Sequence, residues 1–292
     1  MAEKPVLTRT LRTLVPAILL LLPGAERVRA GGGDWYESIK IEFQRRPTAT
    51  LFYGWGNTTL EDIRTPLTDP GILELQLGGS KVRWEDDNPD LLRFKNSYVS
   101  VSLMAPRLGE NRSVPGEAAF EQWRFALGDA KGYGYPLGSP DRELLLYNSG
   151  SFGWTWMELV EPSPIPEEQQ FLGTFTDGVR FGTSAGAGLR INPIPMLALD
   201  LNVERGLVFR RHLVAAWGTS VLIEAAAGWG LDAFISGVMD STPEAVPVVS
   251  FLLKGGLAYG FSELRRSNMN WPFDSEPPLV NDAFKVGMSF MF

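Results

Sequence analysis

The sequence has no cysteine and only one histidine among its 292 residues. Without cysteine the chain forms no disulfide and has no thiol nucleophile, and one histidine cannot build a Cys/His zinc site. The 27 Lys and Arg residues are outnumbered by 34 Asp and Glu residues, for a net charge of -7. Because nucleic-acid affinity rests on cations that neutralise phosphates, we expect no nucleic-acid partner. The sequence also contains no phosphate loop and no cluster of metal ligands, so we expect no cofactor and no metal ion.

Long hydrophobic runs are scarce as well, and the mean hydropathy of -0.04 excludes a bundle of transmembrane helices. The apolar run at residues 14–22 is too short to cross a bilayer. It follows a basic segment and precedes Val28 and Ala30, which place small residues at the -3 and -1 positions of a cleavage site. This pattern predicts a secretory signal peptide over residues 1–30. Its removal takes away five basic and two acidic residues and leaves an exported chain, residues 31–292, with a net charge of -10.

The last ten residues alternate between two faces. Apolar side chains occupy one face, at Phe284, Val286, Met288, Phe290 and Phe292. This period of two is typical of a β-strand. The segment resembles the last strand of bacterial outer-membrane β-barrels, whose terminal Phe is read by the barrel assembly machinery. The resemblance implies export through the periplasm to the outer membrane, with membrane lipid and, through Phe292, the assembly machinery as partners.

The clearest pair of strands lies at residues 180–192 and 197–204, on either side of a Pro-Ile-Pro turn. Apolar residues alternate there with small or polar ones, as they do in transmembrane strands. A charged side chain that faced lipid near the bilayer midplane would cost about 2–4 kcal/mol. We therefore expect the polar face of this pair to line the lumen, with Arg180, Arg190, Asp200, Asn202 and Glu204 as the lumen-facing candidates.

Weaker alternating runs bring the number of candidate strands to nine: 35–44, 48–56, 71–84, 91–104, 119–133, 143–158, 180–192, 197–204 and 283–292. The connections between them alternate in length, as short periplasmic turns and longer outside loops do. Because single-chain bacterial barrels have an even number of strands, we prefer eight strands to ten. The predicted fold is mainly β, an antiparallel transmembrane barrel of about eight strands.

Residues 207–282 do not alternate. We predict a helical hairpin at about residues 210–268, inserted before the last strand, with a capping box at 241–244 that starts its second helix. Pro247 and Gly255-Gly256 should bend that helix. A helical pair as apolar as this one must be buried. We therefore expect it to plug or cap the barrel. Gly182, Gly186 and Gly188 would allow the helices to come close to the wall. A pair that lies on the membrane interface, or crosses the membrane, is the alternative.

Candidate catalytic residues are few. His212 is the only imidazole, and Ser220 and Glu224 lie one turn apart in the predicted helix. Some outer-membrane lipid hydrolases combine Ser, His and an acid within a barrel, yet here no flanking motif supports a triad. Our working hypothesis is a non-enzymatic outer-membrane barrel, largely occluded by its helical insertion, that is structural or that binds or passes a small apolar solute. The alternatives are a barrel-embedded lipid-modifying hydrolase using His212 and a soluble secreted β-protein that binds lipid.

Overall fold

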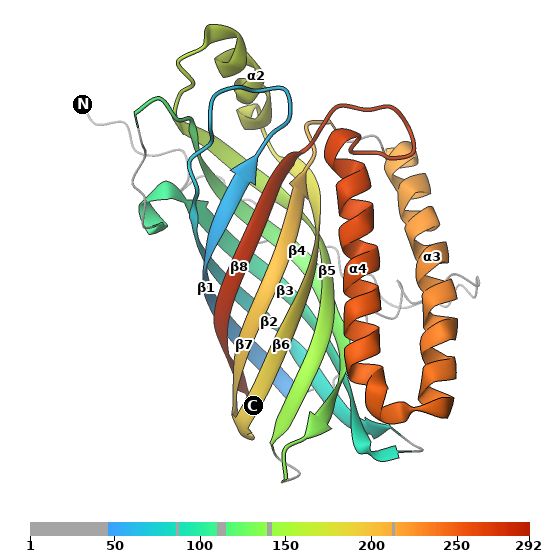
Figure 1. Ribbon diagram of the computed structural model, residues 1–292. Helices are drawn as coiled ribbons and strands as arrows, with labels where there is room; N and C mark the ends of the chain where they lie inside the picture. Colours follow the sequence, from blue (N-terminus) through green and yellow to red (C-terminus); the bar gives the residue numbers. More distant parts are fainter. Residues whose placement is uncertain (1–45, 86–87, 110–114, 139–141, 212–213) are drawn as a thin grey trace, which may run out of the picture. The chain divides into compact units, whose positions relative to one another are not determined.

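The computed structural model describes residues 46–85, 88–109, 115–138, 142–211 and 214–292. Eight strands form a closed antiparallel barrel, in which each strand pairs with its neighbours in the sequence (Figure 1). The strands are β1 (Arg46–Thr59), β2 (Gly71–Glu85), β3 (Asn88–Ala105), β4 (Ala119–Pro136), β5 (Glu143–Glu161), β6 (Arg180–Ile194), β7 (Leu197–Val208) and β8 (Leu279–Met291). The helices are α2 (Pro166–Thr176), α3 (Val214–Ser241) and α4 (Val246–Ser267), with 3-10 turns η1 (Pro106–Leu108) and η2 (Pro243–Ala245).

The barrel closes between its first and last strands. The pairing of β1 with β8 runs from Thr48 opposite Met291 to Thr59 opposite Val280. Because β1 also pairs with β2, neither of its edges is open to a further strand. The prediction of eight strands in a mainly β barrel is confirmed, and the alternative of ten is wrong. The predicted signal peptide and the run at 35–44 lie outside the described residues.

The two ends of the barrel differ in the length of their connections. At one end, called the turn end, lie the short connections after β2, β4 and β6 and the last residue of β8. At the other, called the loop end, lie the long connections 60–70, 106–118, 162–179 and 209–278. The expected alternation of short and long connections is therefore confirmed.

The wall is polar inside and apolar outside. On β7, Asp200 and Asn202 are buried in the lumen, whereas Leu199, Leu201 and Val203 are exposed on the outside. The same alternation on the other strands leaves a broad apolar outer surface, formed on β1, β2, β3 and β8 by Leu51, Tyr53, Trp55, Leu73, Leu75, Leu77, Val99, Val101, Phe284, Val286, Met288 and Phe290. A side-chain period of two is what a pleated strand imposes.

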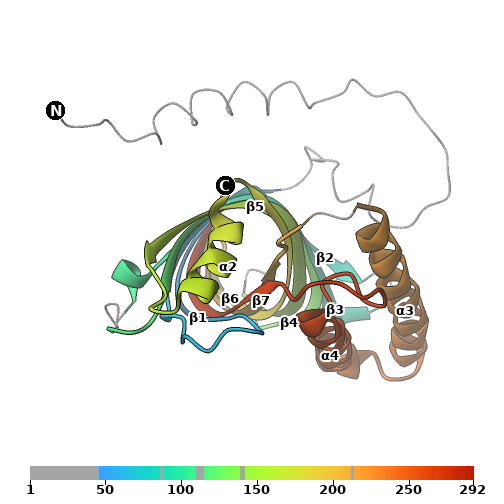
Figure 2. The ribbon, with the colours of Figure 1, turned by 90° about the horizontal axis from the view of Figure 1, so that it is seen from above.

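The predicted helical hairpin is present before the last strand, but it lies outside the barrel. Helices α3 and α4 run beside the wall between the loop end and the turn end, and α4 packs on the outer face of β4 to β7 (Figures 1 and 2). The prediction of a helical plug or cap is wrong. An eight-stranded barrel is just wide enough for its own side chains, which leaves no room for a helix about 10 Å across.

The turn of the hairpin also differs from the prediction. Ser241 is the last residue of α3, and its hydroxyl donates back to the Gly237 carbonyl at 3.0 Å, so it caps no following helix. The 3-10 turn η2 intervenes, and α4 begins at Val246. Pro247 therefore lies in the first turn of α4, where an amide hydrogen is not required.

The loop end is closed by packing. Helix α2 sits over the mouth of the barrel (Figure 2). It buries Leu172 and Phe175 against Leu60, Ala118, Phe120, Met157, Val208 and Leu279. The first turn of α2 is tied to the loop after β1, since Glu168 accepts hydrogen bonds from the Arg64 and Thr65 amides at 2.8 and 3.0 Å. The mouth is thus covered by apolar contacts and hydrogen bonds.

Candidate functional site

Two charge networks fill the lumen, and the first centres on the β6–β7 pair. Arg190 and Asp200 lie directly opposite each other, with Nε 2.8 Å from Oδ1, and both side chains are buried. Ser289 donates to the other Asp200 oxygen at 2.7 Å and accepts from Arg190 Nη2 at 3.0 Å. The Arg190 guanidinium also lies 5.0 Å from the centre of the Phe94 ring. Each charge of this ion pair therefore has a partner of opposite sign inside the barrel.

The second network lies nearer the loop end. Lys285 Nζ is 2.7 Å from Glu74 Oε2 and 2.6 Å from Glu204 Oε2. Arg124 completes the group, with Nη1 3.2 Å from the other Glu204 oxygen. Two cations thus face two carboxylates from β2, β4, β7 and β8. A buried ion pair needs such matching, because an unpaired charge out of water is costly.

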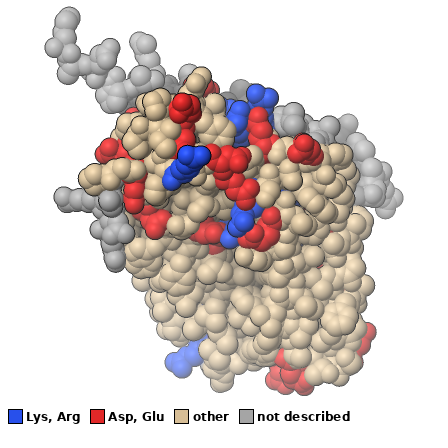
Figure 3. Space-filling view, turned by 45° about the horizontal axis from the view of Figure 1, so that its top comes forward, with Lys and Arg blue, Asp and Glu red and all other residues tan. Residues whose placement is uncertain are grey.

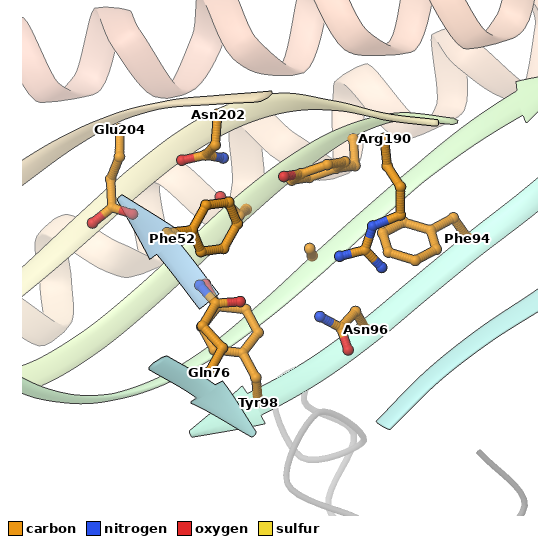
Figure 4. A pocket seen from close by; sticks show the side chains of 11 residues that line it. Phe52, Gln76, Phe94, Asn96, Tyr98, Arg190, Asn202 and Glu204 are labelled. Atoms are coloured by element: carbon orange, nitrogen blue, oxygen red, sulfur yellow. The ribbon is translucent and has the colours of Figure 1, made fainter. Parts of the chain in front are cut away.

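Aromatic rings occupy the space that remains. Phe52 and Tyr147 each lie over the glycine paired with them on the neighbouring strand, because a Cβ on Gly287 or Gly188 would come within 2.4 or 2.3 Å of the ring. A cavity among these side chains holds about 10 Å³, room for about one water molecule. Its lining residues point toward one another across the lumen (Figure 4). The lumen is sealed by its own side chains.

The structure places four of the five lumen-facing candidates inside the barrel: Arg190, Asp200, Asn202 and Glu204. Arg180, at the start of β6, sits at the mouth. It donates to the carbonyls of Thr174, Phe175 and Arg210. A cation there complements the carbonyls at the carboxyl end of α2. Arg180 therefore helps to hold the cover of the mouth in place.

The candidate catalytic residues do not form a triad in the described part of the chain. His212 lies outside the described residues. Arg265 of α4 donates to Ser220 Oγ at 3.1 and 3.0 Å and pairs with Glu224 Oε2 at 2.7 Å. An arginine cannot accept a proton at neutral pH, so this contact does not activate the serine. Ser220 and Glu224 instead join the two helices, as Asp232 and Lys254 do at 2.6 Å.

The wall beneath the hairpin is built from small and polar residues. A Cβ on Gly255 of α4 would lie 3.9 Å from Ala187 Cβ and 3.1 Å from Asn148 Nδ2. Asn148 also donates to the Phe251 carbonyl at 3.3 Å. Gly255 thus permits close packing, as small residues do between transmembrane helices. The expected role of Gly182, Gly186 and Gly188 in this contact is wrong, because they lie on the lumen face.

Both ends of the hairpin are fixed to the barrel. At the turn end, Tyr135 donates to the Glu244 carbonyl at 2.6 Å, and Leu91 packs with Ile235 and Val246. At the loop end, Arg205 of β7 forms ion pairs with Glu263 of α4 and Asp282 of β8. The hairpin is therefore part of the folded unit over its whole length.

The sequence argument missed several lumen residues: Phe52, Glu74, Arg124, Tyr147 and Lys285. Glu74 stands between Leu73 and Leu75, and Lys285 between Phe284 and Val286. The signal used for Arg190 and Asp200, a charge within an apolar alternation, would have found both. Among the residues that the structure describes, no group of three or more His, Asp or Glu side chains could hold a metal ion.

Comparison of the sequence with protein-family profiles and with curated proteins gives no match. Among solved structures, the chain is similar to Neisserial surface protein A, with 8% identity, a TM-score of 0.39, and coverage of 84% of this chain and 97% of that one. It is also similar to the attachment invasion locus protein Ail of Yersinia pestis, with 9% identity, a TM-score of 0.31 and coverage of 86% and 100%. The outer membrane enzyme PagL matches with 8% identity, a TM-score of 0.34 and coverage of 83% and 99%.

Proposed function

We propose that this chain is an outer-membrane β-barrel protein that conducts nothing through its lumen and has a structural role in the membrane. The observation that carries the proposal is the filled lumen, in which Lys285, Glu74, Glu204 and Arg124 pair across the interior. A small barrel packed in this way is a rigid core and not a channel. Its functional surface is then the outside of the barrel and the hairpin attached to it.

The distribution of polarity supports a membrane location. Exposed apolar side chains cover the outside of the strands, while charges are buried inside. A soluble barrel that binds lipid has the reverse arrangement, so that alternative is not supported. The strands are 12 to 19 residues long, more than the 9–11 that a tilted strand needs to cross the hydrocarbon core. Charged side chains gather around the loop end, and few interrupt the barrel side in the same view (Figure 3).

The orientation follows from the connections. Outer-membrane barrels have short turns on the periplasmic side and long loops outside, which puts the turn end of this barrel in the periplasm. Phe292 follows β8 at that end, and its amide donates to the Pro47 carbonyl at 3.0 Å beside β1. Its side chain is 72% exposed. An exposed terminal aromatic at the β1–β8 seam suits recognition by the barrel assembly machinery.

The hairpin belongs in the same membrane. Its helices are long and apolar enough to cross a bilayer, by length and composition. Leu222, Trp229 and Phe234 of α3 are more than half exposed. A helix that is apolar on all sides needs an apolar surrounding, and the neighbouring wall already faces lipid in this proposal. We therefore place α3 in lipid and α4 between α3 and the barrel.

Conductance in planar bilayers tests the sealed lumen. The purified protein should give no stable open-channel current, because paired charges and aromatic rings fill the lumen around a cavity of only about 10 Å³. A current should appear only in a variant in which Arg190 and Lys285 are both replaced by Ala and which still folds. A large steady current from the unaltered protein would refute the proposal. The passage of an apolar solute through the lumen has no support, since the lumen is polar and filled.

A further inference from the structure

Five cations gather on the outer wall of β2, β3 and β4 near the turn end. They are Lys81, Arg83, Arg93, Lys95 and Lys131, called the basic cluster below. Each occupies an outward position, since it alternates with lumen-facing residues such as Ser80, Phe94 and Ala130. The cluster therefore lies on the surface that faces the membrane and its boundary.

The strand register sets these cations side by side. Lys81 lies opposite Lys95, and Lys95 lies opposite Lys131 on the next strand. In the next outward row toward the turn end, Arg83 lies opposite Arg93. Directly opposed residues have Cβ atoms about 4.5–5.5 Å apart, and like charges in such pairs destabilise a sheet. The fold therefore holds positive charges together against their mutual repulsion.

Among the described residues, acidic side chains compensate little of this charge. Lys131 lies 3.4 Å from Asp129, with both side chains partly exposed. The other four cations form no ion pair with the described part of the chain. Glu85 and Asp90, the described acids beside the β2–β3 turn, form none either, and Asp232 of the nearby α3 is paired with Lys254. An anion at the membrane surface would supply charge that the described acids do not.

On the loop-end side of the basic cluster, the outward residues of the same strands are apolar. Toward the loop end, the outward residues of β2 are Leu77, Leu75 and Leu73, and those of β3 include Val99 and Val101, all exposed. Along one strip of wall, cations at the turn end are thus followed by apolar side chains toward the middle of the barrel. A phospholipid has the same order, with its phosphate at the membrane surface and its acyl chains toward the midplane.

We propose that the basic cluster binds the phosphate-bearing headgroup of an anionic phospholipid in the leaflet at the turn end. The three lysines present point charges in one row, and Arg83 and Arg93 offer planar donors that match phosphate oxygens. The acyl chains lie along the apolar residues of β2 and β3. This site rests on the proposed membrane location, which puts the turn-end leaflet in contact with the cluster.

Lipid selectivity in mixed micelles tests the site. Native mass spectrometry of the purified full chain, with phosphatidylglycerol or phosphatidylcholine added, should show preferred retention of phosphatidylglycerol. Each cation near an anionic lipid surface contributes about fivefold in binding. The triple variant Lys81→Gln/Lys95→Gln/Lys131→Gln should therefore lose at least tenfold of the preference. Because it removes like-charge repulsion, it should be at least as heat-stable as the unaltered protein in zwitterionic micelles.

A matched control keeps the net charge change the same. The variant Arg64→Gln/Arg107→Gln/Arg266→Gln neutralises three exposed cations at the loop end and should retain the preference. Equal retention of the two lipids by the unaltered protein, or an unchanged preference in the cluster variant, would overturn the site. Displacement of phosphatidylglycerol by equimolar inorganic phosphate would also overturn it, since the cluster would then recognise the free anion and not the lipid.

Failure here is distinguishable from failure of the sealed barrel. A protein that conducts ions yet prefers phosphatidylglycerol would refute the closed lumen and leave the lipid site standing. A protein that conducts nothing and retains both lipids equally would refute the lipid site and leave the closed lumen standing.

Discussion

The ammonium nitrogen of Lys285 lies 2.6 Å from Glu204 Oε2, inside the wall formed by β7 and β8. The two residues are 81 positions apart in the sequence, and the helical hairpin lies between them. Lys285 also reaches Glu74 on the far side of the β1–β8 closure. One cation therefore links three strands across the lumen, and its removal leaves two carboxylates in the interior.

Replacing Lys285 by Met should destabilise the barrel by about 3–5 kcal/mol, because a buried charge that loses its partner stays out of water uncompensated. The temperature at which the folded band disappears in heat-modifiable gel migration measures the loss. Arg107→Met is the control, since Arg107 pairs with Glu121 at the surface with 64% of its side chain exposed. That substitution should cost less than about 1 kcal/mol. Equal effects of the two would contradict the role given to Lys285.

A disulfide should join the hairpin to the wall in the variant Ala187→Cys/Gly255→Cys. The two Cβ positions are 3.9 Å apart, within the 3.5–4.5 Å that a disulfide spans. Because the natural chain has no cysteine, mass spectrometry of the digested, oxidised protein reports the bond without interference. In Ala187→Cys/Gly256→Cys the bond should be absent, since nothing lies within 4 Å of a Cβ on Gly256. If only the Ala187→Cys/Gly256→Cys variant formed the disulfide efficiently, α4 would face the barrel wall with Gly256 and not with Gly255.

Spin labels on α3 and α4 should report a lipid surrounding in proteoliposomes. Cysteines at Leu222 and Leu252, which are 67% and 62% exposed, carry the nitroxide, with Leu75 on the barrel as an embedded reference and Asp240 as a water-exposed one. Labels at 222 and 252 should collide with oxygen more than with a polar nickel complex, as the label at 75 does. Low collision with both reagents, together with dipolar broadening, would show a second copy against α3. Ready collision with nickel at 222 but not at 75 would leave the barrel in the membrane and the hairpin out of it.

Acid should release the loop after β1 from α2, the helix that covers the mouth. Hydrogen bonds from the Thr65 side chain and from the Arg64 and Thr65 amides hold the pKa of Glu168 below its usual value of 4.5. A lowered pKa means that this contact stabilises the fold fully above pH 4.5 and is lost as the pH falls through the lowered value. A spin label at Asp62→Cys should stay immobile from pH 7 to 5 and become mobile in stronger acid.

The variant Glu168→Ala should make the same label mobile at every pH. Glu167→Ala, which removes the exposed neighbouring carboxylate in the first turn of α2, should leave the label immobile at pH 7. A label that responds equally to both variants would show that Glu168 does not hold the loop.

The strands were predictable because one local rule governs them. A side-chain period of two puts Asp200 inside and Leu201 outside whatever the partner strand is, so the best runs and the two ends of the barrel could be predicted from the sequence. The alternation alone gave nine runs, and eight strands were preferred because single-chain bacterial barrels are even-numbered. The same rule places Glu74 and Lys285 in the lumen. It cannot say that they meet, because their distance depends on how the barrel closes between β1 and β8.

The position of the hairpin was not predictable in this way. An apolar helix is equally suited to a protein interior and to lipid, so composition identifies α3 and α4 without choosing their side of the wall. Only the assembled barrel decides, because its lumen is filled by Arg190, Lys285 and the rings beside them. The sequence by itself determined that strands alternate and that a helical pair precedes the last one. The tertiary structure decided the seal of the lumen, the outer site of the hairpin and the row of cations, since each depends on residues that only the strand register brings together.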